Sequence, residues 1–265
     1  MHDADSADPL LPPELERVIF ELAVWQNPET IFALVLVAKR VCTWIEPELY
    51  HVVVFGKPRS LLMLESKPSQ FLGQHVHHLA IPANVLHVDV VRILSTCTGV
   101  HDLAIWNNIS TRPDLLPLLR KLTNLQCLSA NLFALFGGRD DFTLDQFRIP
   151  SPRGATGLWP VFKLLPRVTH LSVTDTYSPE VINAALGTCP VLQLLVAVWG
   201  RDPAMSPPPD ESKISTDPRF CIVLCSLFEF DWELGARGGR DVWRRAEEAV
   251  ANNPRERQKG SDVRE

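Results

Sequence analysis

The sequence predicts an α/β protein in which short N-terminal helices precede a stack of helix–strand repeats with parallel strands. The first observation is a short apolar pattern, built around one leucine, that recurs five times between residues 76 and 197. The second is that an apolar pattern with helical spacing runs into four of these segments. Of the 265 residues 46% are hydrophobic, which is enough for a sizeable core.

The five recurring segments share the form apolar, two variable residues, leucine, one variable residue, and an apolar or small residue. They read VHHLAI, VHDLAI, LQCLSA, VTHLSV and LQLLVA, with central residues Leu79, Leu103, Leu128, Leu171 and Leu195. The intervals between these leucines are 24, 25, 43 and 24 residues. This period is typical of a leucine-rich-repeat-like solenoid, with parallel strands on the concave side and helices outside. We expect it to span residues 52–235.

A helix is predicted before each of the last four strands, because apolar residues precede the strand at i, i+3, i+4 and i+7. The four sets are Val90, Ile93, Leu94, Cys97; Leu115, Leu118, Leu119, Leu122; Leu158, Val161, Phe162, Leu165; and Ile182, Ala185, Leu186, Cys189. Helix starts are indicated at Asp114 and at Ser178, which precedes a proline and an acid. Cys97 and Cys189 occupy the column of Leu122 and Leu165, so we expect core thiols.

Several segments interrupt or end this array. The 43-residue interval contains about 19 more residues than one period, which predicts an inserted loop at 133–157. A proline-rich stretch at 201–218 predicts a second loop, and the alternation in 219–224 predicts a last strand. Residues 236–253 are expected to hold a C-terminal helix, with Asp241 as its N-cap, that caps the end of the solenoid. Residues 1–9 are interpreted as a disordered acidic leader and 254–265 as a charged tail.

The N-terminal segment LPPELERVIFELAV predicts an amphipathic helix with an apolar stripe at i, i+3, i+4 and i+7. The stripe consists of Leu15, Val18, Ile19 and Leu22. Between residues 31 and 50 apolar residues cover nearly the whole circumference of the following helices. One face of these helices is expected to pack on Leu15 and Ile19, and the other needs a cover. That cover is either the first repeat, a separate protein, or both.

The segments LPPELERVIFELAV and LVLVAKRVCTWIEPELY together resemble the F-box, a three-helix module, over residues 10–51. The positions that fit its usual form are Leu11, Pro12, Glu14, Ile19, Leu22, Val37 and Trp44. DPRF, DWELGARGG and W-x-x-A-E, nearer the C-terminus, are similar to F-box-like proteins of mushroom-forming fungi. The stretch Ala23–Thr30 departs from the Leu-Pro dipeptide usual before the second helix.

The resemblance implies a substrate-recognition subunit of a cullin-RING (SCF-type) E3 ubiquitin ligase. The F-box docks a Skp-family adaptor and, through it, a cullin scaffold, while the repeats bind an unknown target protein. The adaptor-binding residues that it implies are Leu11, Pro12, Ile19, Leu22, Val37 and Trp44. The first ten residues are acidic and lack the basic start of a secretory signal, so an intracellular protein, cytoplasmic or nuclear, is expected. The alternative is a scaffold or ligand-binding repeat protein outside any ligase, whose N-terminal helices are only a solenoid cap.

Residues just after the strands are candidates for target binding, because loops at one edge of a solenoid carry recognition. These candidates are Trp106, Asn107, Asn131, Thr174, Asp175, Trp199 and Arg201. Tryptophan and arginine are enriched in binding hot spots. The equally weighted alternative is that the two tryptophans cover the rim of the core.

Other classes of function find little support in the sequence. A net charge of −5 and a pI near 5.9 argue against binding of nucleic acid. The longest apolar run, 31–38, is far too short to span a membrane. The chain contains no hydrolase, zinc-protease or P-loop motif, so no catalytic residues and no cofactor are expected. All six cysteines stand outside C-x-x-C pairs, which favours reduced, buried thiols.

Two further motifs receive plain structural interpretations. His75, His77 and His78 suggest a metal site, but adjacent strand residues point to opposite faces and no further ligand lies at suitable spacing. No metal is therefore expected. The glycines in 235–241 precede a helix as in a phosphate loop, but the lysine and the preceding strand are missing. A turn is predicted there instead.

Overall fold

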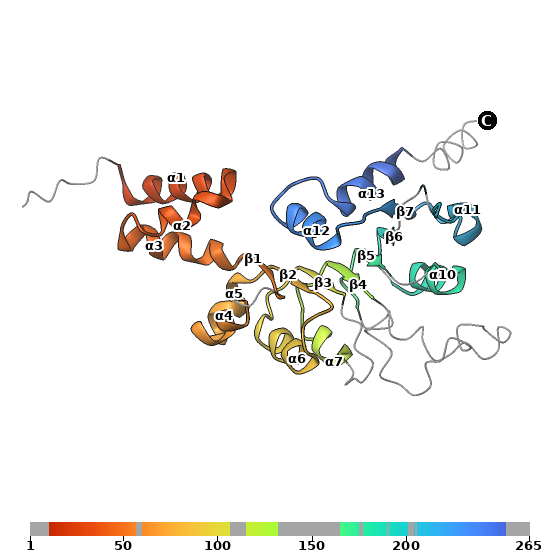
Figure 1. The fold of residues 1–265 in the computed structure, drawn as a ribbon, viewed down its shortest axis with the longest axis horizontal. Coiled ribbons are helices and arrows are strands. Elements are labelled where there is room, and N and C mark those ends of the chain that lie inside the picture. The colour runs from red at the N-terminus through yellow and green to blue at the C-terminus, as the bar shows by residue number, and fades with distance from the viewer. Residues whose placement is uncertain are drawn as a thin grey trace, which may run out of the picture. The chain divides into compact units, whose positions relative to one another are not determined.

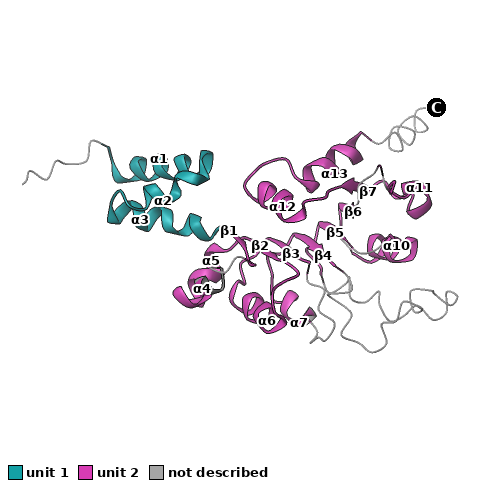
Figure 2. Cartoon of the chain, in the orientation of Figure 1, with its two compact units in different colours: residues 1–51 teal, residues 52–265 magenta. Residues whose placement is uncertain are grey.

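The computed structural model describes residues 11–56, 60–106, 115–131, 165–174, 177–189, 191–200, 204 and 206–252. The leader, the inserted loop and the charged tail lie outside these ranges. The chain forms two compact units, Met1–His51 and Val52–Glu265, shown in teal and magenta in Figure 2. The boundary coincides with the end of the N-terminal module expected from the sequence. No helix in the described ranges combines the length and apolar character needed to cross a bilayer.

The N-terminal unit is helical. Its elements are α1 (Pro13–Gln26), η1 (Pro28–Thr30), α2 (Ile31–Leu34), α3 (Lys39–Ile45) and η2 (Glu46–Tyr50). Proline suits the first position of α1, since that amide has no helical partner in any case. The buried core consists of Val24, Ile31, Val41 and Ile45, and half-buried apolar side chains that include Phe20 and Trp44 pack around it.

The face of α1 that packs on this core differs from the expected one. Phe20 and Val24 pack into it, and Glu16, one turn earlier, accepts two hydrogen bonds from the Arg40 guanidinium, at 2.8 and 3.0 Å. Leu15 and Ile19 are instead exposed. The prediction that they pack inward is wrong, because α1 carries apolar residues on more than one side and spacing alone does not tell which stripe turns inward.

The second unit is built on a seven-stranded parallel sheet in which every strand lies beside the next one in the chain (Figure 1). The strands are β1 (Val52–Val54), β2 (His78–Ile81), β3 (Asp102–Ile105), β4 (Cys127–Ala130), β5 (His170–Val173), β6 (Leu194–Trp199) and β7 (Phe220–Leu224). The α/β class and the parallel strands are confirmed. β1 was not anticipated, because its run of three valines lies outside the repeat pattern.

The five central leucines stack in register across the sheet, as the repeat predicts. Leu79 pairs with Leu103, Leu103 with Leu128, Leu128 with Leu171, and Leu171 with Leu195. The row continues to Val53 at one end and Phe220 at the other. All five leucines are at most 1% exposed, so this row forms a continuous buried layer.

Helices between the strands lie along one face of the sheet, called the first face here (Figure 1). They are α4 (Ser60–Ser66), α5 (Ser69–His75), α6 (His87–Thr96), α7 (Leu116–Leu119) and α10 (Pro179–Thr188). The predicted apolar columns of α6 and α10 are buried, including Cys97 and Cys189. Ser178 precedes α10, but its hydroxyl contacts Glu180 rather than capping the helix. A short helix, α11 (Glu211–Ile214), lies in the stretch expected to be only loop, with Asp210 as its N-cap.

Two C-terminal helices, α12 (Phe228–Ala236) and α13 (Val242–Ala251), lie on the opposite, second face (Figure 1). Trp232 of α12 packs on Ala80 and Ala104, and Ala246 of α13 packs in a cluster with β6 and β7. The C-terminal helix, expected as an end cap, therefore lies on a face of the sheet. Its predicted N-cap is confirmed, since the Asp241 carboxylate accepts from the Arg244 amide at 3.0 Å. The predicted turn is also present, with Gly238 at φ +84°.

The second face can hold two helices because one row of residues on it is mostly small. In register across the strands this row is Val54, Ala80, Ala104, Ser129, Ser172, Val196 and Cys221. Each of these residues follows a residue of the leucine row by one position and so points to the opposite face. Alanine and serine leave room for the large ring of Trp232 to approach the strands.

Candidate functional site

An apolar seam runs along the solvent side of α1. It consists of Leu11, which precedes the helix, and Leu15, Val18, Leu22 and Trp25. The intervals of four, three, four and three residues are those of the a and d positions of a coiled coil. These side chains are 43–75% exposed, and Ile19 beside them is 52% exposed. We call this surface the α1 seam.

The polar surroundings of the α1 seam are solvated and locally paired. Arg17 donates to Glu21 at 2.6 Å, one turn apart on the exposed side of the helix. Glu16 is held by Arg40, as described above. A string of large apolar side chains with charged neighbours is the composition of a protein-binding surface rather than of an ordinary solvated helix.

The residues implied as adaptor-binding do not all lie at the surface. Leu11, Pro12, Ile19, Leu22 and Val37 are exposed, whereas Trp44 is half-buried and packs against the core of the unit. Trp44 therefore supports the module from within. Other exposed apolar residues were not singled out as binding residues: Leu15, Val18, Trp25, Phe32 and Leu36. The heptad spacing from Leu11 to Trp25 is the signal that identifies the first three.

The target-binding candidates of the sheet unit are only partly within the described residues, since Asn107, Asp175 and Arg201 lie outside them. Asn131 is buried, and Thr174 is half-buried. Trp199 is 8% exposed, donates from Nε1 to the Ser206 carbonyl at 3.0 Å, and meets the Tyr177 ring edge-on. Trp199 thus covers the rim of the core, as in the second interpretation of these residues.

Trp106 has different surroundings. Its ring is half-buried, its Nε1 donates to Ser129 Oγ at 3.1 Å, and its centroid lies 6.3 Å from that of Phe228 on α12. Trp106 therefore faces the space between the sheet and the C-terminal helices.

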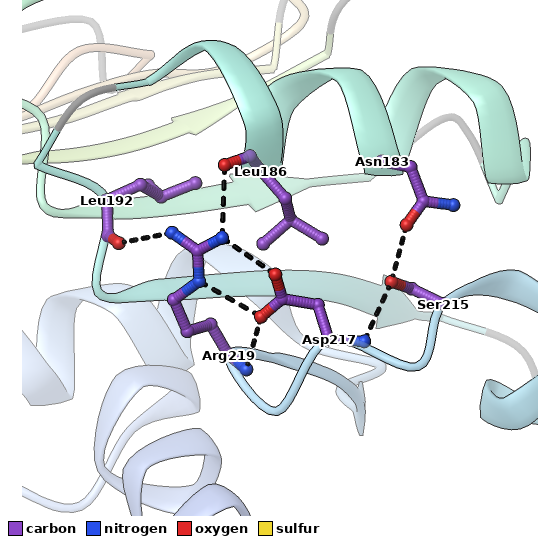
Figure 3. A network of polar contacts seen from close by, with 6 residues as sticks. All are labelled: Asn183, Leu186, Leu192, Ser215, Asp217 and Arg219. Carbon is purple, nitrogen blue, oxygen red and sulfur yellow. Dashed lines mark hydrogen bonds and ion pairs between the residues drawn. The ribbon is translucent and has the colours of Figure 1, made fainter.

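The DPRF motif forms a structural clamp rather than a binding site (Figure 3). The Arg219 guanidinium donates to both oxygens of Asp217, at 3.0 and 2.7 Å, and to the carbonyls of Leu186 and Leu192. Ser215 extends the network by donating to Asn183 on α10 at 2.7 Å. The hydrogen bonds of Arg219 tie the start of β7 to the end of α10 and to the turn that leads into β6.

The thiols are protected rather than reactive. All six cysteines are free, and four of them are buried. Burial raises the pKa of Cys97 and of Cys221 to about 12 and that of Cys189 to about 11. A thiol in such surroundings stays neutral and is a poor nucleophile.

The histidines near β2 pair with other side chains. His77 stacks on His101 with 4.9 Å between ring centroids, and His78 Nδ1 lies 3.4 Å from Asp102 Oδ2. Burial and the charges of His77 and His78 lower the pKa of His101. Among the described residues no group of three or more His, Cys, Asp or Glu side chains is arranged to hold a metal ion.

Comparison with known proteins adds no relative: no family model matches the chain, and no curated protein matches it. The chain is therefore characterised by its own features. It is an α/β protein with a helical N-terminal unit that carries an exposed apolar seam and a parallel-sheet unit with helices on both faces.

Proposed function

We propose that this protein is the substrate-recognition subunit of a cullin-RING (SCF-type) ubiquitin ligase. In this proposal the N-terminal unit is an F-box-like module that docks a Skp-family adaptor through the α1 seam. The sheet unit is a leucine-rich-repeat-like solenoid that binds the target protein, and the transfer of ubiquitin is carried out by other subunits.

The observation that carries the proposal is the exposure of the α1 seam. The unit already has a core without these residues, formed around Val24, Ile31, Val41 and Ile45. Burying one large apolar side chain contributes about 1.5–3 kcal/mol. Several such side chains at heptad spacing are therefore a strong driving force for docking against another helix.

The direct test is capture of a purified Skp-family adaptor by the full-length protein. We expect Leu15→Ser combined with Leu22→Ser to weaken binding by at least about 30-fold, since central apolar anchors contribute about 1–2 kcal/mol each or more. Both residues are about half exposed, so the fold should tolerate the changes. The matched control is Arg17→Ser with Glu21→Ser, which removes an exposed ion pair from the same helix and should leave binding intact.

The outcome that contradicts the proposal is a folded Leu15→Ser, Leu22→Ser variant that captures the adaptor as well as the parent does. Trp44→Ala is unsuitable for this purpose, because Trp44 packs in the core of the unit and its loss would unfold the module.

The alternative, a scaffold outside any ligase with an N-terminal cap, makes a different prediction. Terminal caps are required for a solenoid to remain folded. If residues 1–51 are only a cap, a chain that begins at Val52 will lose cooperative unfolding. Under the ligase proposal it will unfold cooperatively, because β1 and the rest of the sheet are retained.

A further inference from the structure

A cavity lies between the second face of the sheet and the two C-terminal helices. Its lining includes the aromatic rings of Trp106, Phe228, Trp232 and Trp243, together with polar atoms of β4, β5 and the start of α13. Two of these rings belong to motifs noted in the sequence, since Trp232 lies in DWELGARGG and Trp243 opens W-x-x-A-E. All of the lining residues lie within the sheet unit.

The polar side of the cavity has unmet hydrogen-bonding capacity. Ser172 is fully buried, lines the cavity, and its Oγ has no hydrogen-bond partner. The neighbouring Ser129 Oγ accepts from Trp106 Nε1. A buried hydroxyl without a partner is costly, and its oxygen presents a partial negative charge to the cavity that a cationic occupant would balance.

The charge of the cavity comes from Asp241. This residue is 8% exposed, and within the described residues its carboxylate makes no ion pair and accepts only the α13 cap bond, on Oδ1. The second cavity carboxylate, Asp231, is already bound by Arg245 at 2.7 Å and by the Val242 amide at 2.7 Å. Burial raises the pKa of Asp241, and the carboxylates of Asp231 and Asp102 raise it further. The neighbouring charges that raise the pKa of Asp241 are therefore negative, and the Arg245 guanidinium is bound to Asp231.

The aromatic rings that line the cavity can supply the remaining contacts of a cation-binding site. The Trp106 and Phe228 rings are tilted by 45° with centroids 6.3 Å apart, which forms a wedge of two π surfaces. The Nε1 groups of Trp106 and Trp232 are bound to Ser129 and Asp102, so these rings offer π surface rather than free donors. Aromatic faces attract cations, and several faces together bind alkylated ammonium groups.

The size of the cavity limits the ligand. The centre of a water-sized sphere can occupy about 20 Å³. If this volume is treated as a sphere and the radius of a water molecule is added all round, the space is roughly 6 Å across, which is wider than a single water molecule. This matches a methylated ammonium group and is smaller than a nucleotide or a sugar ring.

We propose that this cavity binds an alkylated ammonium group, held between the rings of Trp106, Phe228, Trp232 and Trp243 and the Asp241 carboxylate. The group belongs either to a methylated lysine side chain or to a small quaternary amine, which share this chemistry. The inference concerns only the sheet unit and is independent of adaptor binding by the α1 seam.

The test follows the indole N–H resonances of the full-length protein by NMR during titration with choline chloride. We expect the resonances of Trp106, Trp232 and Trp243 to shift saturably, while that of Trp25, outside the cavity, stays in place. A peptide containing trimethyllysine is titrated in parallel. Tighter binding of the peptide identifies a protein side chain as the source of the group, and tighter binding of choline identifies a free amine.

Two matched ligands and three variants decide the outcome. The carbon isostere of choline, with a tert-butyl group in place of trimethylammonium, should bind at least about tenfold more weakly. Trp106→Leu and Asp241→Asn should each weaken choline binding by about 3- to 30-fold. Asparagine is also a good N-cap, so Asp241→Asn keeps α13 in place. Trp25→Leu is the control and should bind as the parent does.

Three results would overturn the proposal. One is a choline titration that shifts the resonances no further than sodium chloride at the same concentration, which would mean that the cavity holds only water. Another is equal binding of choline and its uncharged isostere. The third is an Asp241→Asn variant that is folded and binds choline with unchanged affinity.

Discussion

The Arg219 clamp provides a stability prediction whose size can be worked out from the geometry in Figure 3. The guanidinium forms four hydrogen bonds: Nε and Nη2 to Asp217, Nη1 to the Leu192 carbonyl at 3.0 Å, and Nη2 to the Leu186 carbonyl at 3.1 Å. Leu186 lies in the last turn of α10, where carbonyls have no helical partner. In Arg219→Lys one ammonium nitrogen replaces this planar fork and cannot reach all four acceptors.

The expected loss follows from the bonds that lysine cannot make. Hydrogen bonds to charged groups contribute about 1.5–3 kcal/mol when buried and neutral ones about 1 kcal/mol. The Arg219 side chain is 36% exposed, so water replaces part of what is lost. We therefore expect Arg219→Lys to lower the free energy of unfolding by about 1–2 kcal/mol. For a unit of this size that corresponds to a fall in Tm of about 2–8 °C.

The assay is urea unfolding followed by circular dichroism, with Arg92→Lys as the matched control. Arg92 is about half exposed and reaches Glu65 only at 3.4 Å, so its replacement should change stability by less than about 0.5 kcal/mol. Hydrogen exchange at the turn between α10 and β6 should accelerate in Arg219→Lys alone. If Arg219→Lys is as stable as Arg92→Lys, the clamp does not hold β7 to α10 and the reasoning fails.

Three further predictions concern the layers of the sheet unit. Leu128→Ala should cost about 2–5 kcal/mol in urea unfolding, whereas Leu227→Ala, at a side chain 68% exposed, should cost under about 1 kcal/mol; equal losses would contradict the leucine row. The raised pKa of Cys97, about 12 against 9.0 for a free thiol, favours the neutral form in the folded state. Its contribution to stability is complete below pH 9 and is lost as the pH rises toward 12, so unfolding followed at rising pH should become easier and Cys97→Ser should flatten that dependence. The pKa of Asp241 is also raised, so ionising this carboxyl costs more in the folded than in the unfolded state, and Asp241→Asn, which removes that cost, should be at least as stable as the parent at pH 7. Asp241→Ala should lose the cap and about 1 kcal/mol of stability in urea unfolding, and an Asp241→Ala variant as stable as Asp241→Asn would exclude the capping role.

The leucine row was predictable because a repeat converts one-dimensional spacing directly into lateral register. Each of the five leucines is one repeat from its neighbour, and even the 43-residue interval preserves the pairing of Leu128 with Leu171. An insertion between two parallel strands lengthens the connection without altering the register of the strands. The repeat pattern therefore predicts the correct strand pairing even where one interval is longer than the 24- or 25-residue period.

The inward face of α1 was not predictable from spacing. Leu15, Val18 and Leu22 form an apolar stripe as regular as the one that contains Phe20 and Val24. Which stripe becomes the core depends on the partner helices: Phe20 and Val24 pack in the core of the unit, and Arg40 on α3 binds Glu16 on the same side of α1. A helix with two apolar stripes indicates a second contact surface, but the sequence alone does not tell which stripe faces the core and which remains exposed.

The site on the second face escaped prediction for another reason. α12 contains two glutamates, an aspartate and a glycine in nine residues, and its exposed Phe230 and buried Trp232 obscure an apolar period. Only tertiary structure brings Trp232 onto Ala80 and Ala104. The signal present in the sequence was the small residue, alanine or serine, after four of the five central leucines, which marks a close approach from the other side.

The coverage of the second face constrains where a target can bind. In an open solenoid the variable residue after each central leucine faces solvent and contacts ligands. Here Ala80, Ala104, Ser129 and Ser172 are all buried, and α12 and α13 lie over the face to which they point. A protein target therefore has no access to the strands themselves. Under the ligase proposal, the target must therefore bind at the edges of the layer formed by the sheet, α12 and α13. One such edge is at Trp106 and Phe228, where the sheet and its covering helices meet around a cavity. A side chain from a target, rather than a whole surface, is what this arrangement can receive.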